Sequence, residues 1–288
     1  MSQTLLNAAV ATKRSVNVRM YPGRRRRSVQ EPRENLESRL ATLQKDYAEL
    51  HTEIFEAAQV HRRLCAPRLV RHGNFEIASE IFAVRHLPGD FFTVDEKDGS
   101  VIMALGDICG KGLAAGMWTT HLVGLVGSRV ATTCRPEAIV AGVNRDVCLR
   151  ESTVPLASLF LAKLDTNTGL LNYCSAGHPP ALLLRANGEL ELLSDGGLLL
   201  GVMAAAPYVS GWVKLHEGDV LMIYSDGITD SEDCAGNEFG DARLEMQLRR
   251  AQGGPADSVL FSVLGAVQDF AAACPLVDDM SVAIVRQS

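Results

Sequence analysis

The 288-residue sequence lacks any apolar run near the roughly 20 residues that a membrane-spanning helix needs. It also lacks a secretory pattern of charged, apolar and small residues at its start, so we expect a cytoplasmic protein without a membrane span. The seven cysteines include no C-x-x-C pair. This scatter predicts reduced thiols and argues against a disulfide framework or a zinc site.

Acidic residues are absent from residues 1–30, where seven Lys and Arg residues give a net charge of +7. Because the whole chain carries −6, the remaining residues carry −13. An acidic body argues against nucleic acid as its ligand. We therefore expect residues 1–33 to form a basic, disordered tail. The alternative is that the four arginines at 24–27 bind nucleic acid or anionic lipid.

A narrow apolar seam predicts a coiled-coil linker helix over residues 34–66. Its positions follow one another at alternating spacings of four and three over about four heptads, with charged residues between them. We expect a homodimer through residues 36–64, and Pro67 to end the helix. The alternative is a single amphipathic helix packed on its own domain. The seam consists of Leu36, Leu40, Leu43, Tyr47, Leu50, Ile54, Ala57, His61 and Leu64.

Residues 67–288 show no repeating βαβ rhythm, no internal repeat and no low-complexity segment. Hairpin signals such as Asp98-Gly99 and Asn187-Gly188 predict antiparallel strands, and Pro136 marks the start of a helix. The order of elements predicts an α+β fold in which helices cover sheet faces. We expect strands at 75–84, the run from 101, 157–164, 170–175, 181–185, 190–193, 208–215, 219–224 and 280–286. We expect helices at 113–130, 136–150, 241–251 and 256–273.

Four strand ends share one pattern, an apolar run adjoining an acidic residue. Taken singly, each Asp is best explained as a turn or cap residue. Gathered at one sheet end, several carboxylates would repel one another unless cations neutralised them. Oxygen ligands without His or Cys favour Mg²⁺ or Mn²⁺, and two such ions can activate a bridging water for hydrolysis of a phosphate monoester. The four places are Gly89-Asp90, Gly106-Asp107, Ser225-Asp226-Gly227 and Asp278-Asp279.

These segments resemble the metal-dependent type 2C protein serine/threonine phosphatases. The similarity is greatest to the bacterial branch of the stage II sporulation protein E and sigma-factor-regulation phosphatases. Seven segments occur in the family's order and cover about residues 75–287. They are PGDFF (88–92), GDICGKGLAAGM (106–117), SAGHPPALLL (175–184), LGVM (200–203), GDVLMIYSDGITDSED (218–233), EFG (238–240) and DDMSVAIV (278–285).

The resemblance implies an αββα sandwich of two antiparallel β-sheets flanked by helix pairs, with two Mn²⁺ or Mg²⁺ ions at one edge. It assigns Asp107 to bridge both ions, and the carbonyl oxygen of Ile108 to one of them. Asp226 and Asp278 complete the other site. Asp90 supports the centre directly or through water, and Asp279 lies in the outer shell or exchanges roles with Asp278. A loop of Gly110, Lys111 and Gly112 lies beside the site, with Lys111 either contacting phosphate or remaining solvated.

The resemblance also implies a substrate, a phosphorylated anti-sigma-factor antagonist of the STAS type. Pro88 and Thr93 depart from the family pattern, and they support the alternative of a catalytically weak or inactive dimeric signalling scaffold. Neither change removes a predicted ligand, so we expect an active enzyme. Cys109 replaces a small hydroxyl residue, either as a passive buried thiol or as a point of oxidation. His178 invites the role of a general acid, but the resemblance implies a structural role in a turn.

Overall fold

The computed structural model describes residues 30–65, 69–97, 99–149, 155–272 and 274–287 of the 288-residue chain. The chain divides into two compact units, residues 1–50 and residues 51–288. One helix, α1 (Gln30–Cys65), begins in the first unit and ends in the second. None of the helices in the described part of the chain is long and apolar enough to cross a membrane.

The second unit contains two six-stranded β-sheets, in which every strand pairing except that of β9 with β6 is antiparallel. The first sheet has the order β1-β2-β12-β11-β7-β8, and the second has the order β10-β6-β5-β4-β3 with the two-residue strand β9 paired in parallel to β6. The first sheet comprises β1 (Leu69–His72), β2 (Phe75–Phe82), β7 (Ala181–Leu184), β8 (Leu190–Leu193), β11 (Val220–Tyr224) and β12 (Met280–Gln287). The second comprises β3 (Phe91–Lys97), β4 (Ser100–Ile108), β5 (Ala157–Asp165), β6 (Leu170–Ala176), β9 (Gly196–Gly197) and β10 (Gly211–Lys214).

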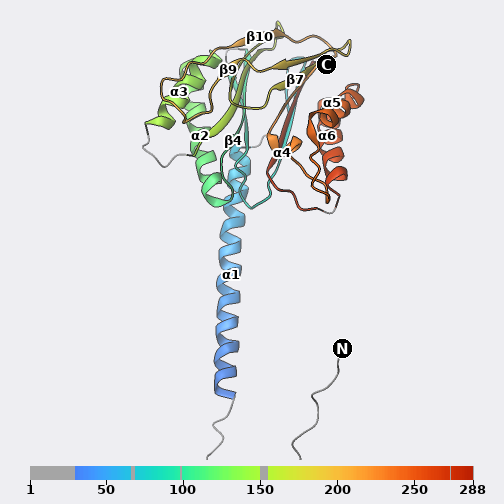
Figure 1. Cartoon of the computed structure of the whole chain (residues 1–288). Helices are drawn as coiled ribbons and strands as arrows, with labels where there is room; N and C mark the ends of the chain where they lie inside the picture. The colour runs from blue at the N-terminus through green and yellow to red at the C-terminus, as the bar shows by residue number, and fades with distance from the viewer. Residues whose placement is uncertain (1–29, 66–68, 98, 150–154, 273, 288) are drawn as a thin grey trace, which may run out of the picture. The chain divides into compact units, whose positions relative to one another are not determined.

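The helices cover the two outer faces of this pair of sheets (Figure 1). On one face, α2 (Leu113–Thr132) and α3 (Pro136–Cys148) pack on the second sheet; on the other, α5 (Gly240–Ala251) and α6 (Ala256–Ala271) pack on the first. Three separate apolar cores lie between the sheets and under each helix pair. The fold is therefore the αββα sandwich that the resemblance implied.

Buried strands explain why the apolar runs in the sequence are nearly continuous. β4 has one residue, Asp107, that is not fully buried, because sheet neighbours flank it and layers cover both faces. It forms a hairpin with β3, in which Phe91 pairs with Gly106. The hairpin predicted at Asp98-Gly99 is confirmed in its two strands, although Asp98 lies outside the described residues.

Several expectations need correction. The short strands β1 and β9 and the helix α4 (Asp226–Thr229) were not predicted. The strand expected at 208–215 is confined to β10, and Tyr208 instead donates a hydrogen bond to the carbonyl of Leu198. Three predictions lie outside the described residues. They are the end of the linker helix at Pro67, the ends of two helices at residues 150 and 273, and the basic tail over residues 1–29.

The expectation that all seven cysteines are reduced is wrong in this structure. Cys234 and Cys274 form a disulfide with a Cα–Cα distance of 5.7 Å. The free cysteines among the described residues are Cys65, Cys109, Cys134, Cys148 and Cys174. Forty residues separate the bonded pair, so no short spacing motif marks it.

The predicted linker helix is confirmed as a helix, and its seam has two parts. Leu36, Leu43 and Tyr47 are each more than 65% exposed. In the last turns, by contrast, His61 and Cys65 are buried within the second unit. The alternative of packing on its own domain therefore describes the end of α1. For the exposed part of the seam, the homodimeric coiled coil stays a prediction.

Candidate metal centre

Asp90 and Asp107 are held by the β3–β4 hairpin. Asp90 directly precedes β3, Asp107 lies near the end of β4, and the side chain of Asp90 is only 1% exposed. Burial raises the pKa of Asp90 well above its usual range, and the negative charge of Asp107 raises it further. No described N–H or O–H group donates a hydrogen bond to Asp90 Oδ2. A buried acidic pair of this kind needs a shared proton or a cation.

The carboxyl of Asp107 faces the other acidic residues of the cluster. Burial raises its pKa to about 6, and the charges of Asp226, Asp278 and Asp279 contribute in the same direction. A hydrogen bond from Asp90 opposes this shift. These interactions bring together the five carboxylates that the sequence predicted from four separate strand ends.

Backbone oxygens converge near the same point, beside Gly89. A Cβ atom on Gly89 would lie 3.2 Å from Asp107 Oδ1, 3.2 Å from the carbonyl oxygen of Ile108 and 3.4 Å from that of Gly110. The absence of a side chain at Gly89 therefore leaves a small space lined by three oxygens. Oxygens from a carboxylate and from carbonyls are the donor set that hard divalent cations prefer. The residues present thus fit the expected metal.

Asp279 has a different position from the other carboxylates. Its Oδ1 accepts a hydrogen bond from the N–H of Val84, and its Oδ2 accepts one from the N–H of Gly89, both at 2.7 Å. Both oxygens therefore hold the loop between β2 and β3, which ends at Asp90. On the other side, Thr119 of α2 donates a hydrogen bond to the carbonyl of Gly89 at 2.8 Å.

Asp226 begins the four-residue helix α4, and one residue separates it from the end of the buried strand β11. Burial raises its pKa, as do the neighbouring charges of Asp230 and Asp278, while Lys111 lowers it. The helix approaches the last strand closely, since a Cβ on Gly227 would lie 2.0 Å from the carbonyl oxygen of Asp279. Only glycine permits this approach, which explains the Asp-Gly pair in the sequence.

Lys111 contributes a cationic side chain to the cluster. Its Nζ lies 2.8 Å from Asp278 Oδ2 and donates a hydrogen bond of 2.6 Å to the carbonyl of Val277. The flanking residues Gly110 and Gly112 have positive φ, which permits the tight turn that directs Lys111 toward Asp278. The side chain of Asp278 is nevertheless 46% exposed.

Two further side chains were open questions in the sequence. Cys109 is an exposed residue rather than a buried one. Partial desolvation of its thiol is the main cause that raises its pKa, and the negative charges of Asp107 and Asp226 raise it further. His178 is buried, its Nδ1 lies 2.8 Å from Ser158 Oγ, and burial lowers its pKa to about 3. A neutral histidine enclosed in this way matches the structural role.

As the side chains stand, no three His, Cys, Asp or Glu residues of the described ranges are arranged to hold one ion. The cluster is a set of neighbouring carboxylates and carbonyls rather than a closed coordination sphere. The supporting contacts of Thr119, Asp279 and Gly89 were missed by the sequence reasoning. The sequence marks two of these residues, through the glycine before Asp90 and through the paired aspartates at 278–279, but it does not show the contacts that they make.

Known proteins resemble this chain in sequence. The sequence profile of the family described as stage II sporulation protein E (SpoIIE) matches residues 97–288. Phosphoserine phosphatase RsbU of Bacillus subtilis (strain 168) is 24% identical over 190 residues, which cover 66% of this chain and 57% of that relative. The chain thus spans little more than half of RsbU.

Solved structures share the fold at low sequence identity. The SiaA-PP2C domain of Pseudomonas aeruginosa superposes with a TM-score of 0.75 at 16% identity, covering 84% of this chain and 99% of that one. The catalytic domain of the serine/threonine protein phosphatase PstP, in complex with two manganese ions, gives a TM-score of 0.51 at 17% identity over 74% of this chain and 97% of that one.

Proposed function

Because the chain belongs to the SpoIIE family, we propose that it hydrolyses phosphoserine or phosphothreonine on a protein, using Mn²⁺ or Mg²⁺. The observation that carries the proposal is the gathering of Asp90, Asp107, Asp226 and Asp278. Apart from burial, the charge of Asp107 raises the pKa of Asp90, and the charges of Asp226 and Asp278 raise the pKa of Asp107. When bound, the divalent cation supplies a water of lowered pKa and neutralises the negative charge of the phosphate.

Each residue has a role in this proposal. Asp107 would be shared between two ions, with the carbonyl oxygen of Ile108 beside it on the space next to Gly89. Asp226 and Asp278 would hold the second ion. Asp90 supports Asp107 from its buried position. Asp279 acts as a positioning residue, because both of its oxygens accept backbone hydrogen bonds.

We propose a phosphorylated STAS-type protein as the substrate. The support is the similarity to RsbU, a phosphoserine phosphatase, together with the resemblance to sigma-factor-regulation phosphatases. Purified chain incubated with phosphorylated STAS proteins and with an unrelated phosphopeptide tests this class directly. Equal rates on both substrates would argue against STAS specificity while leaving the phosphatase proposal intact.

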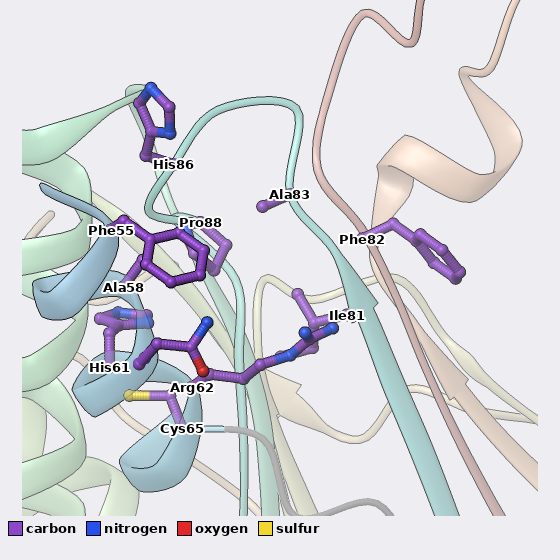
Figure 2. Close-up of a pocket in the computed structure, with 11 residues that line it drawn as sticks. Phe55, Ala58, His61, Arg62, Cys65, Ile81, Phe82, Ala83, His86 and Pro88 are labelled. Carbon is purple, nitrogen blue, oxygen red and sulfur yellow. The ribbon is translucent and has the colours of Figure 1, made fainter. Parts of the chain in front are cut away.

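We propose that α1 mediates homodimerisation and regulates the centre. Its seam residues Leu36, Leu43 and Tyr47 are exposed. Its other end lines a cavity of about 330 Å³ with the loop that follows β2, including Phe55, His61 and Pro88 (Figure 2). This loop continues to Gly89 and Asp90, so a movement of the helix would displace residues that adjoin the carboxylates. A monomer in light scattering at micromolar concentration would contradict the dimer.

The deciding assay is release of phosphate from a phosphoserine peptide with and without Mn²⁺. The phosphatase proposal predicts release that depends on the cation and disappears in Asp107→Asn. The matched control is Asp269→Asn, which changes an exposed carboxyl on α6 and should leave the rate unchanged. Cation-independent release would contradict the proposed chemistry.

The competing candidate is an inactive dimeric scaffold, which only Pro88 and Thr93 support. Calorimetry separates the two, because the scaffold predicts no binding of Mn²⁺ or Mg²⁺.

A further inference from the structure

The Cys234–Cys274 disulfide connects two segments that each carry a carboxylate of the candidate metal centre. Cys234 lies eight positions after Asp226, and Cys274 lies four positions before Asp278. Cys234 is exposed and Cys274 is half-buried, so a thiol in solution can reach the bond.

The segment that contains Cys234 is well ordered by local hydrogen bonds. Asp233 Oδ1 accepts hydrogen bonds from the N–H groups of Ala235 and Asn237, and Asp233 Oδ2 accepts one from the Asn237 side chain. The N–H of Phe239 donates to the carbonyl of Ser231, which closes the loop onto the end of α4. This turn is therefore a firm attachment point.

The segment from Cys274 to Asp278 has few other attachments among the described residues. The N–H of Cys274 donates to the carbonyl of Ala271 at the end of α6, and Leu276 packs partly against the core. Val277 is exposed, and its carbonyl accepts the hydrogen bond from Lys111. The disulfide is thus the covalent anchor of a segment that ends at a proposed metal ligand.

We propose that Cys234 and Cys274 form a reversible redox modification site that positions Asp278. The inference rests on the proposed cation site. Its co-reactant is a dithiol, either a small molecule or a protein with two neighbouring cysteines. A disulfide in a protein of a reducing compartment is typically redox-sensing rather than structural, and this bond is open to solvent.

The exchange balances in two steps. A thiolate of the dithiol attacks Sγ of Cys234, a mixed disulfide forms, and Cys274 leaves as a thiolate that takes up a proton. The second thiol of the reductant, as its thiolate, then attacks the reductant's first sulfur, which is bonded to Cys234 Sγ in the mixed disulfide. This step releases Cys234 as a thiolate, which is protonated in turn. The protein gains two electrons and two protons, and the dithiol becomes a disulfide.

The first measurement needs no metal. Mass spectrometry of the full chain digested without reductant should show the peptide containing Cys234 joined to that containing Cys274. Hydrogen exchange should then show residues 276–279 exchanging about tenfold faster after reduction with a phosphine, because local opening becomes easier. An absent cross-linked peptide, or identical exchange in both states, overturns the inference.

The second measurement is Mn²⁺ affinity by calorimetry on the oxidised and the reduced chain. We expect about tenfold weaker binding after reduction, the size typical of losing a group that orients a metal ligand. The C234S/C274S variant should bind Mn²⁺ as weakly as the reduced chain does, and the reductant should not change its affinity. The C134S variant removes a free cysteine at the α2–α3 connection and should behave as the unaltered chain does.

The outcomes distinguish the two proposals. Equal Mn²⁺ affinity in both redox states overturns the positioning of Asp278, whether or not hydrogen exchange becomes faster. It leaves the phosphatase proposal intact. Absence of Mn²⁺ binding in either state contradicts the proposed function and, with it, this inference. If the double variant fails to fold, which circular dichroism reveals, the reduced chain provides the same comparison.

Discussion

Asp90 and Asp107 are held by two paired strands, whereas Asp226 and Asp278 lie on a four-residue helix and on a loop. The first pair is embedded among buried residues, and burial is the main cause of the raised pKa values of Asp90 and Asp107. The second pair is more accessible and has a cationic neighbour in Lys111.

This difference separates two tasks. The strand-held pair is fixed before any ligand arrives, and its mutual repulsion lowers the stability of the metal-free fold. The loop-held pair keeps its charges partly solvated and neutralised, so its position depends on weaker contacts. The account therefore predicts that changes at the first pair affect both stability and activity, and that changes at the second affect mainly metal affinity.

The largest effect is expected for Asp107→Asn. Under the proposal that Asp107 is shared by both ions, its replacement removes several kcal/mol of transition-state stabilisation, so phosphate release should fall about a thousandfold or more. The same change removes a buried charge, so the metal-free variant should melt several degrees higher at pH 7.5 by differential scanning fluorimetry. Unchanged melting temperature would show that the strand-held pair is not a source of repulsion.

Asp278→Asn tests the loop-held pair. Calorimetry should show Mn²⁺ binding weakened about 10- to 100-fold, the range seen when metal-site geometry is disturbed. The metal-free melting temperature should change little, because the side chain is half exposed and removal also frees Lys111. A stability gain as large as that of Asp107→Asn would erase the distinction between the pairs.

The pH profile provides a third test. The pKa of Asp107 lies at about 6 in the folded chain, above its ordinary value of 3.8, so the folded state binds more protons between these values. Metal-free stability should therefore decrease as pH rises from about 4 to 6 and then level off, by up to about 3 kcal/mol. Phosphate release should instead decline about tenfold per pH unit below 6, as protons compete with the cation. Urea titrations and rates measured across pH 4.5–8 check both trends.

The smallest effect is expected for Lys111→Met. Because Nζ is paired with Asp278 Oδ2, its removal should tighten Mn²⁺ binding by about threefold, or about 0.6 kcal/mol, a surface-pair magnitude. If Lys111 instead contacts phosphate, the KM for phosphopeptide should rise while Mn²⁺ affinity stays constant. Measuring both constants in the same preparation separates these roles.

Much of the fold follows from local pattern in the sequence. The Asn187-Gly188 turn, Pro136 and the continuous apolar run of β4 each mark an element whose type depends on nearby residues. The residues of the candidate site could be predicted for the same reason, since each Asp adjoins a buried strand. The family resemblance then predicted that these strand ends lie together, which the spacing of the residues along the sequence does not predict.

The remaining features depend on contacts between distant residues. Asp279 is distinguished from Asp278 by its burial and by the hydrogen bonds that it accepts from Val84 and Gly89, almost 200 residues earlier in the chain. The disulfide joins cysteines 40 residues apart, and α4 is too short to leave a periodic pattern. In each case the tertiary structure decides the outcome.

The most direct test of the central claim is phosphate release from a phosphoserine peptide, measured with the oxidised chain in Mn²⁺ and again after chelation. The account predicts turnover with the cation, none after chelation and full recovery when Mn²⁺ is restored. Turnover that persists in the chelator, or equal turnover in Asp107→Asn, would contradict it.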